Sequence, residues 1–323
     1  MTTADRLRHV VRATPERVEE ALSALLAAGP AASARFARQA ETARIALDRM
    51  WCLADEFGRY RMAVLAVPSL GRTAMLLASH PRSSDEAQAL GRAIAAAAEG
   101  CGDACDIAQA LVEPSRPLDL EAFEAGGLQR MATLDYLERH LPRSGVLEPT
   151  PVPDGWTIGL VADPRVLSGD DPRALGDACR GEIAAVLDAS YIDTRDCPGL
   201  AGMRRTLDVL DGHFGLGGKP RFWFAARRGG GEARGVCLMN ASADGGSAEL
   251  VYLGLARDAR GTGVSRALLT AGLHACSAAR VSTVSLAVDA GNEPARRLYE
   301  SHGFRRTSSR IALVRRLARH GAG

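Results

Sequence analysis

A short loop with two glycines constrains this chain more than any other feature. An apolar run, 250–255, precedes the loop Arg-Gly-Thr-Gly-Val-Ser at 260–265, and leucines with helical spacing follow it at 266–273. This order predicts a strand, a turn and a helix, in which the free N–H groups of the first helical turn and the positive end of the helix dipole point to one place. A phosphate or pyrophosphate group is the natural occupant of such a place.

The residue types within the loop fit an anion site. Two glycines keep Cβ atoms away from an approaching anion, and the flanking arginines add positive charge. We therefore expect anion contacts from Arg260, Gly261, Thr262, Gly263, Val264, Ser265 and Arg266. The loop lacks the Gly-Lys-Ser/Thr ending of nucleotide-hydrolysing P-loops, and Ser265 stands near the position of the third glycine of dinucleotide folds. The alternative is a helix start with two turn glycines and no ligand.

A second pattern lies further along the chain, after an expected buried strand at 284–288. It consists of Asn292, Ala295, Tyr299, Gly303 and Phe304. The loop and this pattern together resemble the GNAT acyltransferase superfamily, which has an Arg/Gln-x-x-Gly-x-Gly/Ala loop followed by Asn-x-x-Ala-x-x-x-Tyr-x-x-x-Gly-Phe. The second pattern is complete here, whereas the first has a serine in place of its last Gly/Ala.

An internal repeat indicates how the chain is divided. A shift of 176 residues places 112–113 on 288–289 and Phe123 on Tyr299, and the expected order of strands and helices also recurs. We predict an α/β fold with a mixed α+β sheet, built as two tandem GNAT-like acyl-CoA N-acyltransferase domains. Their expected ranges are 1–140 and 154–323, with a proline-rich linker at 141–153.

The two halves differ at the positions that matter for the chemistry. In place of the glycine loop, the first half has 79–85, which contains no glycine and ends on Asp85. Phe123 corresponds to Tyr299, and Arg116 stands where the second half has its asparagine. These differences predict that the N-terminal domain has lost cofactor binding and is structural, shapes the acceptor pocket or binds an unknown ligand.

Composition limits the partners and the compartment. The 323 residues suffice for two domains. A net charge of +2, from 40 basic and 38 acidic residues, does not indicate nucleic acid or a membrane surface. Seven cysteines without regular spacing indicate neither a disulfide framework nor a metal site. With no secretory leader and no apolar run of about 18 residues, we expect a soluble, cytoplasmic protein.

The resemblance implies transfer of an acetyl group from acetyl-CoA to an amine by direct attack in a ternary complex. It implies that the pantetheine arm pairs with the strand at Leu253, Gly254 and Leu255, whose main chain also polarises the thioester carbonyl. Asn292 would hydrogen-bond the pantetheine region, and Tyr299 would protonate the leaving thiolate. The alternative for Tyr299 is a purely packing role.

The base and the acceptor are less constrained. Glu249 opens the strand, and alternation places it on one face with Val251, Leu253 and Leu255. The run 249–255 is similar to the corresponding strand of mycothiol synthases, in which a glutamate serves as base; the alternative is a charge at a strand edge. Asp193 and Asp196 could hold a cationic amine, but for Asp196 we instead expect a role in starting a helix at Pro198.

The acceptor class and the activity itself remain open at this stage. The acceptor would be a small-molecule amine, a protein N-terminus or a lysine. The rival function is a non-catalytic acyl-CoA-binding or interaction protein, which Ser265 favours because it narrows the loop.

Overall fold

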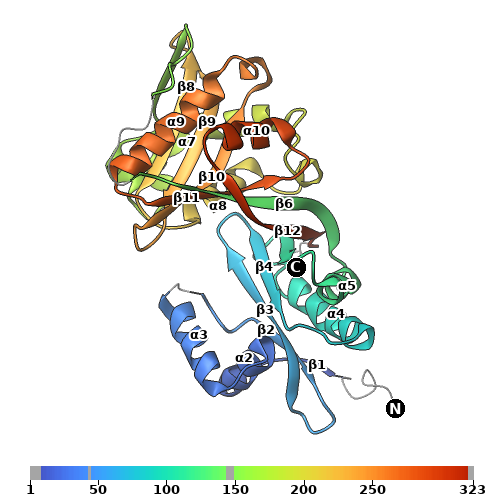
Figure 1. The fold of residues 1–323 in the computed structure, drawn as a ribbon. Helices are drawn as coiled ribbons and strands as arrows, with labels where there is room; N and C mark the ends of the chain where they lie inside the picture. Colours follow the sequence, from blue (N-terminus) through green and yellow to red (C-terminus); the bar gives the residue numbers. More distant parts are fainter. Residues whose placement is uncertain (1–8, 43–44, 143–148, 319–323) are drawn as a thin grey trace. The chain divides into compact units, whose positions relative to one another are not determined.

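The computed structural model describes residues 9–42, 45–142 and 149–318. The chain forms two compact units, which we call the N-terminal and the C-terminal unit (Figure 1). The N-terminal unit comprises Met1–Ala132 and Arg310–Gly323, and the C-terminal unit comprises Thr133–Ser309.

The N-terminal unit has a mixed sheet in the order β1-β2-β3-β4-β5-β12. Its strands are β1 (His9–Arg12), β2 (Met50–Ala54), β3 (Tyr60–Ser69), β4 (Thr73–Ala78), β5 (Ile107–Val112) and the end of β12 (Arg305–Arg316). Its helices are α2 (Val18–Leu26), α3 (Pro30–Thr42), α4 (Ser84–Glu99) and α5 (Pro117–Ala125), with a 3₁₀ turn η1 (Pro15–Arg17). β4 and β5 are parallel, whereas the pairs β1–β2, β2–β3, β3–β4 and β5–β12 are antiparallel.

The C-terminal unit repeats this order as β7-β8-β9-β10-β11-β6. Its strands are β7 (Trp156–Leu160), β8 (Arg221–Arg228), β9 (Ala233–Ala241), β10 (Ser247–Leu255), β11 (Thr283–Asp289) and β6 (Gln129–His140). Here β10 and β11 form the parallel pair. The mixed sheets and their repeated order confirm the predicted α/β class and agree with an internal duplication.

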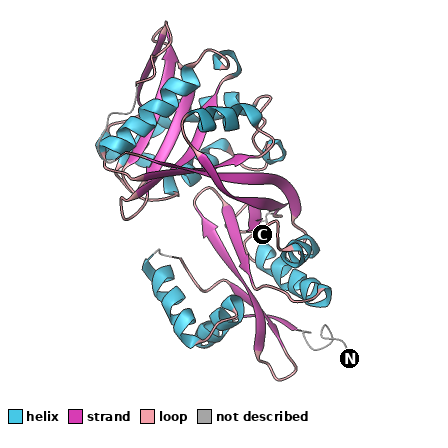
Figure 2. Ribbon diagram, in the orientation of Figure 1, coloured by secondary structure: helices cyan, strands magenta, loops and turns pink. Residues whose placement is uncertain are grey.

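Helices cover both faces of the C-terminal sheet, as Figure 2 shows in cyan against the magenta strands. The helices are α6 (Pro164–Leu167), α7 (Gly176–Tyr191), α8 (Thr206–Gly215), α9 (Val264–Ala278) and α10 (Glu293–Ser301), with 3₁₀ turns η2 (Pro172–Leu175), η3 (Pro198–Leu200) and η4 (Arg257–Ala259). One core contains Leu268 and Leu269 of α9, and the other contains Leu187 of α7 with Phe214 of α8.

The last strand of each half completes the sheet of the other unit. β6 ends the first half of the chain but pairs antiparallel with β11, and β12 ends the second half but pairs antiparallel with β5. Burial explains these placements: Leu137 of β6 lies in a core of the C-terminal unit, and Leu313 of β12 lies in a core of the N-terminal unit. The units therefore divide the chain elsewhere than at the expected ranges 1–140 and 154–323.

The structure also bears on the expected linker at 141–153 and on the helix expected to start at Pro198. Residues 143–148 of the expected linker lie outside the described residues. On either side of them, Leu141 is buried in the C-terminal unit, and the Thr150 hydroxyl lies 2.8 Å from the Thr270 hydroxyl of α9. The helix expected to start at Pro198 is only the short turn η3; α8 begins at Thr206, after Gly202 takes a left-handed φ of 70°.

Candidate active site

A cleft forms where β10 and β11 separate. The two strands pair in parallel only from 247–250 with 283–286. Beyond that point, β11 continues along β6 and β10 continues along β9, so that one edge of 251–255 has no neighbouring strand among the described residues. A bulge at Val251 contributes, because an extra residue bends the strand that carries it. The main chain of β10 thus offers hydrogen-bonding groups to a ligand in the cleft.

The cleft contains a cavity of about 240 Å³ in which many of the predicted residues meet. Those that line it are Leu253, Gly254, Leu255, Arg260, Asn292 and Tyr299. Glu249 and residues 261–266 are absent from this lining. The glycine at 254 is required by close packing, since a Cβ there would lie 2.4 Å from the Tyr252 ring and 2.9 Å from the Ser190 hydroxyl.

The bulge in β10 overturns the expected alternation of side chains. Register shifts by one residue between Leu250 and Tyr252, so the parity of the strand changes at Val251. Leu253 and Leu255 therefore pack with Leu250 on the α9 side of the sheet. Val251 and Tyr252 pack with α7 and α8 on the other side. The prediction that Glu249 shares a face with Leu253 and Leu255 is wrong, because a bulge cannot be read from the sequence pattern.

The predicted anion loop leads into α9 as expected. Gly261 and Gly263 have left-handed φ values of 76° and 86°, which glycine adopts without strain. Gly263 is the N-cap residue, and no side chain accepts a hydrogen bond from the first turn of α9 among the described residues. Val264 is fully buried and packs in the core with Leu268 and Leu269. The N–H groups of 261–265 have no hydrogen-bond partner among the described residues and so remain free for a ligand.

Arg260, predicted to bind an anion, instead forms hydrogen bonds with main-chain carbonyl groups. Its guanidinium donates to the carbonyl oxygens of Ser190 at 2.9 Å and Ile192 at 2.7 Å, at the C-terminal end of α7. A cation at this end also interacts favourably with the helix dipole. The geometry gives Arg260 a structural role that joins α7 to the loop.

Asn292 and Tyr299 stand on α10, which borders the cleft. The Asn292 side chain accepts a hydrogen bond from the Ala295 N–H at 3.4 Å and so caps the helix. The Tyr299 ring is buried and meets the Phe304 ring edge-on at 5.9 Å between centroids. Burial, with a smaller contribution from the Asp196 carboxylate, raises the pKa of the Tyr299 phenol above its usual range. The phenol therefore stays protonated at neutral pH.

Glu249 lies on β10 opposite Asn240 of β9, and it is exposed. Surrounding protein atoms desolvate the carboxylate and raise its pKa. The Asn240 side chain is committed to Trp223 and to the carbonyls of His213 and Leu216. Because residues directly opposite each other project to the same face, Glu249 lies on the α8 side of the sheet.

A second cavity of about 310 Å³ adjoins the first. Its wall includes Tyr191, Arg204 and His213, and the two cavities share Thr194, Asp196, Val251 and Tyr252. Burial, reinforced by Arg204, lowers the pKa of His213 to about 4, so this imidazole is neutral. Its Nε2 atom is buried without a hydrogen-bond partner among the described residues.

Asp196 does not cap a helix, contrary to expectation. The N-cap of η3 is Cys197, without a side-chain hydrogen bond. Instead, Asp196 Oδ1 accepts from the Asp289 N–H at 3.2 Å, and Asp289 Oδ2 accepts from the Cys197 N–H at 3.1 Å. Burial, followed by the Asp196 and Asp289 carboxylates, raises the pKa of the Cys197 thiol to about 12, which leaves it a poor nucleophile.

Comparisons with known proteins agree with this geometry. Residues 189–304 match the Acetyltransferase (GNAT) family. A mycothiol acetyltransferase of Acidothermus cellulolyticus is 41% identical over 75 residues, a stretch that covers 23% of this chain and 23% of that protein. The chain thus matches about a quarter of the length of this curated relative.

Two solved structures share the fold over most of the chain. A GCN5-related N-acetyltransferase from Sphaerobacter thermophilus superposes with a TM-score of 0.56 at 17% identity, covering 95% of each chain. A tandem GNAT protein from the clavulanic acid biosynthesis pathway gives a TM-score of 0.51 at 17% identity, covering 83% of this chain and 82% of that one. Residues 189–304 thus match the GNAT family, and over most of its length the chain has a fold similar to that of a tandem GNAT protein.

Within 9–42, 45–142 and 149–318, every helix is too short or too polar to cross a bilayer.

Proposed function

We propose that this protein transfers the acetyl group of acetyl-CoA to an amine, with one active site in the C-terminal unit. The cleft between β10 and β11 is the observation that carries the proposal. It has an unpaired strand edge and a protonated tyrosine, and the loop that follows β10 in the chain leads into a helix start with free N–H groups. Acyl transfer from a long, pyrophosphate-bearing thioester needs these three elements.

Each element has a distinct part in the proposed reaction. The N–H groups of 261–265 bind the pyrophosphate of acetyl-CoA, and the pantetheine arm extends along 253–255. Main-chain groups of β10 polarise the thioester carbonyl and stabilise the oxyanion of the tetrahedral adduct. Tyr299 protonates the thiolate as the C–S bond breaks. Because the acceptor attacks directly, no covalent enzyme intermediate is required.

The second cavity suits a small-molecule acceptor. Its volume of about 310 Å³ falls at the lower end of the range for small-ligand pockets, roughly 300–1,000 Å³. Val251 and Tyr252 belong to the walls of both cavities, next to the expected position of the thioester. We therefore favour a small amine over a protein N-terminus or a lysine side chain.

Two measurements test the proposal. Calorimetry with acetyl-CoA is expected to give one bound molecule per chain. A panel of aliphatic monoamines, diamines, amino sugars and amino-acid amides is then incubated with acetyl-CoA, and the release of free CoA thiol is followed. Thiol release that depends on an amine supports the transferase. Binding of acetyl-CoA without amine-dependent release would instead support a non-catalytic acyl-CoA-binding protein, and two molecules per chain would disprove the single site.

A further inference from the structure

We propose that Asp196 is the catalytic base that receives the proton of the acceptor ammonium group. The inference rests on the proposed transferase function and assigns a role within that same site. The carboxylate stands in a loop, 192–197, between α7 and η3, where the sequence favoured a helix start over binding of a cationic amine.

Asp196 stands where the walls of the two cavities meet. Asp196 lines both cavities and is the acidic residue among the four that they share. The acyl group must arrive through the first cavity and the amine through the second, so the shared wall is where they meet. A base must lie within hydrogen-bond reach of the proton it removes. Glu249 lines neither of these cavities.

The Asp196 carboxylate is held by a main-chain hydrogen bond and not by an ion pair among the described residues. The Asp289 N–H fixes Oδ1, and no cation of the described part of the chain forms an ion pair with Asp196. Asp193, three residues earlier, differs in this respect because it pairs with Arg257 at 3.2 Å. Asp196 therefore keeps its charge available for a ligand, whereas Asp193 is already neutralised.

The groups around Asp196 make its carboxylate a better proton acceptor. Groups that face Asp196 are Tyr191 of α7, Tyr252 of β10, Asp289 of β11, Tyr299 of α10 and the neighbouring Cys197, each of which interacts electrostatically with the carboxylate. Arg260 and Arg204 line the adjoining cavity walls. Desolvation raises the pKa of Asp196, the Asp289 N–H opposes this, and the Asp289 carboxylate adds to it. A raised carboxyl pKa makes a better proton acceptor near neutral pH.

The proton transfers balance as follows. The Asp196 carboxylate takes one proton from the ammonium group, and the neutral nitrogen forms a bond to the thioester carbon. When the C–S bond of the tetrahedral adduct breaks, the thiolate takes the proton of Tyr299, and Tyr299 recovers a proton from the nitrogen. Asp196 finally releases its proton to solvent, so the products are the amide, free CoA and one proton.

The test compares Asp196→Asn with two matched variants, Asp193→Asn in the same loop and Glu249→Gln on β10. The substrate is the amine of the panel that the wild type uses fastest, and kcat/KM is measured from pH 6 to 10. At pH 7 we expect Asp196→Asn to lose about 10²–10³-fold, while acetyl-CoA binding changes less than twofold. The loss should shrink towards pH 10, since the free amine then no longer needs a base. Asp193→Asn should stay within about threefold of the wild type.

Asp196→Glu guards against a merely structural effect. It keeps a carboxylate and is expected to retain the wild-type dependence on pH, with a lower rate. A loss in Asp196→Asn that is the same at every pH, or a pH-dependent loss in Glu249→Gln instead, would overturn the role of Asp196. Wild-type protein that binds acetyl-CoA but acetylates no amine would overturn the transferase itself, which separates the two failures.

Discussion

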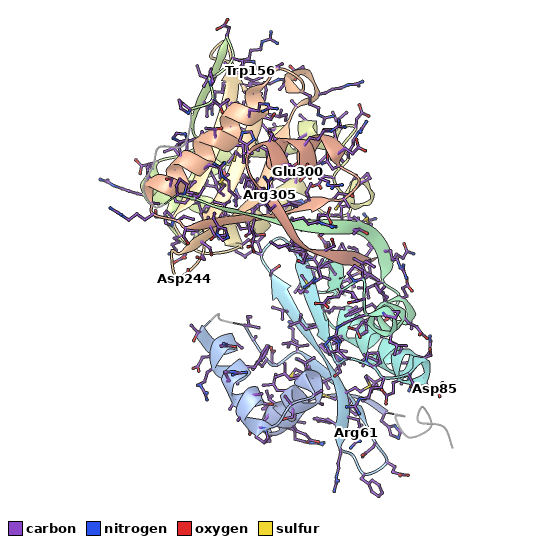
Figure 3. The ribbon with its side chains drawn as sticks, in the orientation of Figure 1. Arg61, Asp85, Trp156, Asp244, Glu300 and Arg305 are labelled. Carbon is purple, nitrogen blue, oxygen red and sulfur yellow. The ribbon has the colours of Figure 1, made fainter. Side chains whose placement is uncertain are left out.

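Each of the two units has a cleft between two parallel strands that separate, and the two clefts differ in the residues at their edges. In the N-terminal unit, β4 and β5 pair only from 73–75 with 107–109 before they separate, as β10 and β11 do in the C-terminal unit. The helix that follows β4 is α4, and Figure 3 labels Asp85 in its first turn. The difference lies at the starts of α4 and α9.

The first turn of α4 is occupied by its own side chains. Ser83 Oγ accepts from the Glu86 N–H at 3.2 Å, and Glu86 Oε2 accepts from the Arg82 N–H at 2.7 Å. The arrangement resembles a capping box, except that Glu86 accepts from the residue before the N-cap and not from the N-cap itself. Asp85 and Glu86 also place negative charge where an anion would bind. The start of α9 has neither the caps nor the acids, and the comparison shows that stabilising a helix start and keeping it open for a ligand are competing uses of the same N–H groups.

The two clefts also differ at the position of the proposed acid. Phe123 stands in the N-terminal unit where Tyr299 stands in the other, and the wall of that cleft contains His80 and Asp119, with 2.7 Å between Nδ1 and Oδ2. A phenylalanine cannot donate a proton, so the N-terminal cleft lacks the acid proposed for the reaction.

The largest expected effect comes from Gly263→Glu. The left-handed φ of 86° costs a residue with a Cβ about 1–2 kcal/mol, and the carboxylate would repel the pyrophosphate. We expect acetyl-CoA affinity to fall about 100-fold or more, measured by calorimetry, where each 1.4 kcal/mol is a factor of about ten. Ser84→Glu, at the start of α4, is the control and should leave binding unchanged. Equal losses in both variants would break the comparison between the helix starts.

An effect of similar size, on turnover and not on affinity, is expected from Tyr299→Phe, which gives the C-terminal cleft the residue of its counterpart. Loss of a general acid lowers kcat about 10²-fold or more, whereas the KM for acetyl-CoA should change little because the ring is retained. Phe123→Tyr, the reverse change, should have no effect on turnover. An unchanged kcat in Tyr299→Phe would remove the tyrosine from the mechanism.

The smallest effect is expected from Ser83→Ala. It removes the cap of α4, which is worth about 1 kcal/mol, and should lower the thermal midpoint of the N-terminal unit by a few degrees. Acetyl-CoA binding should be unaffected. A rise in bound acetyl-CoA to two molecules per chain would show that the cap alone closes the N-terminal site.

The sequence alone was enough to predict the class of fold, its duplication and the two patterns of the C-terminal half. These features are local: glycines at left-handed positions, a strand before them and a helix after them are determined by backbone sterics and short-range hydrogen bonds. For the same reason, Gly261 and Gly263 were placed correctly at the start of α9. Asn292 and Tyr299 reach the cleft because helical periodicity fixes their faces once α10 is anchored.

Only the tertiary structure decided the remaining features, since each depends on contacts between distant residues. The bulge at Val251 reversed the faces of β10. Arg260 donates hydrogen bonds to the carbonyls at the end of α7. The Asp289 N–H donates to Asp196, which lies in the wall shared by the two cavities. The sequence pattern also cannot predict the exchange of β6 and β12, because side chains alternate in both strands and either strand could complete either sheet. Only the burial of Leu137 and Leu313 in different cores distinguishes the two strands.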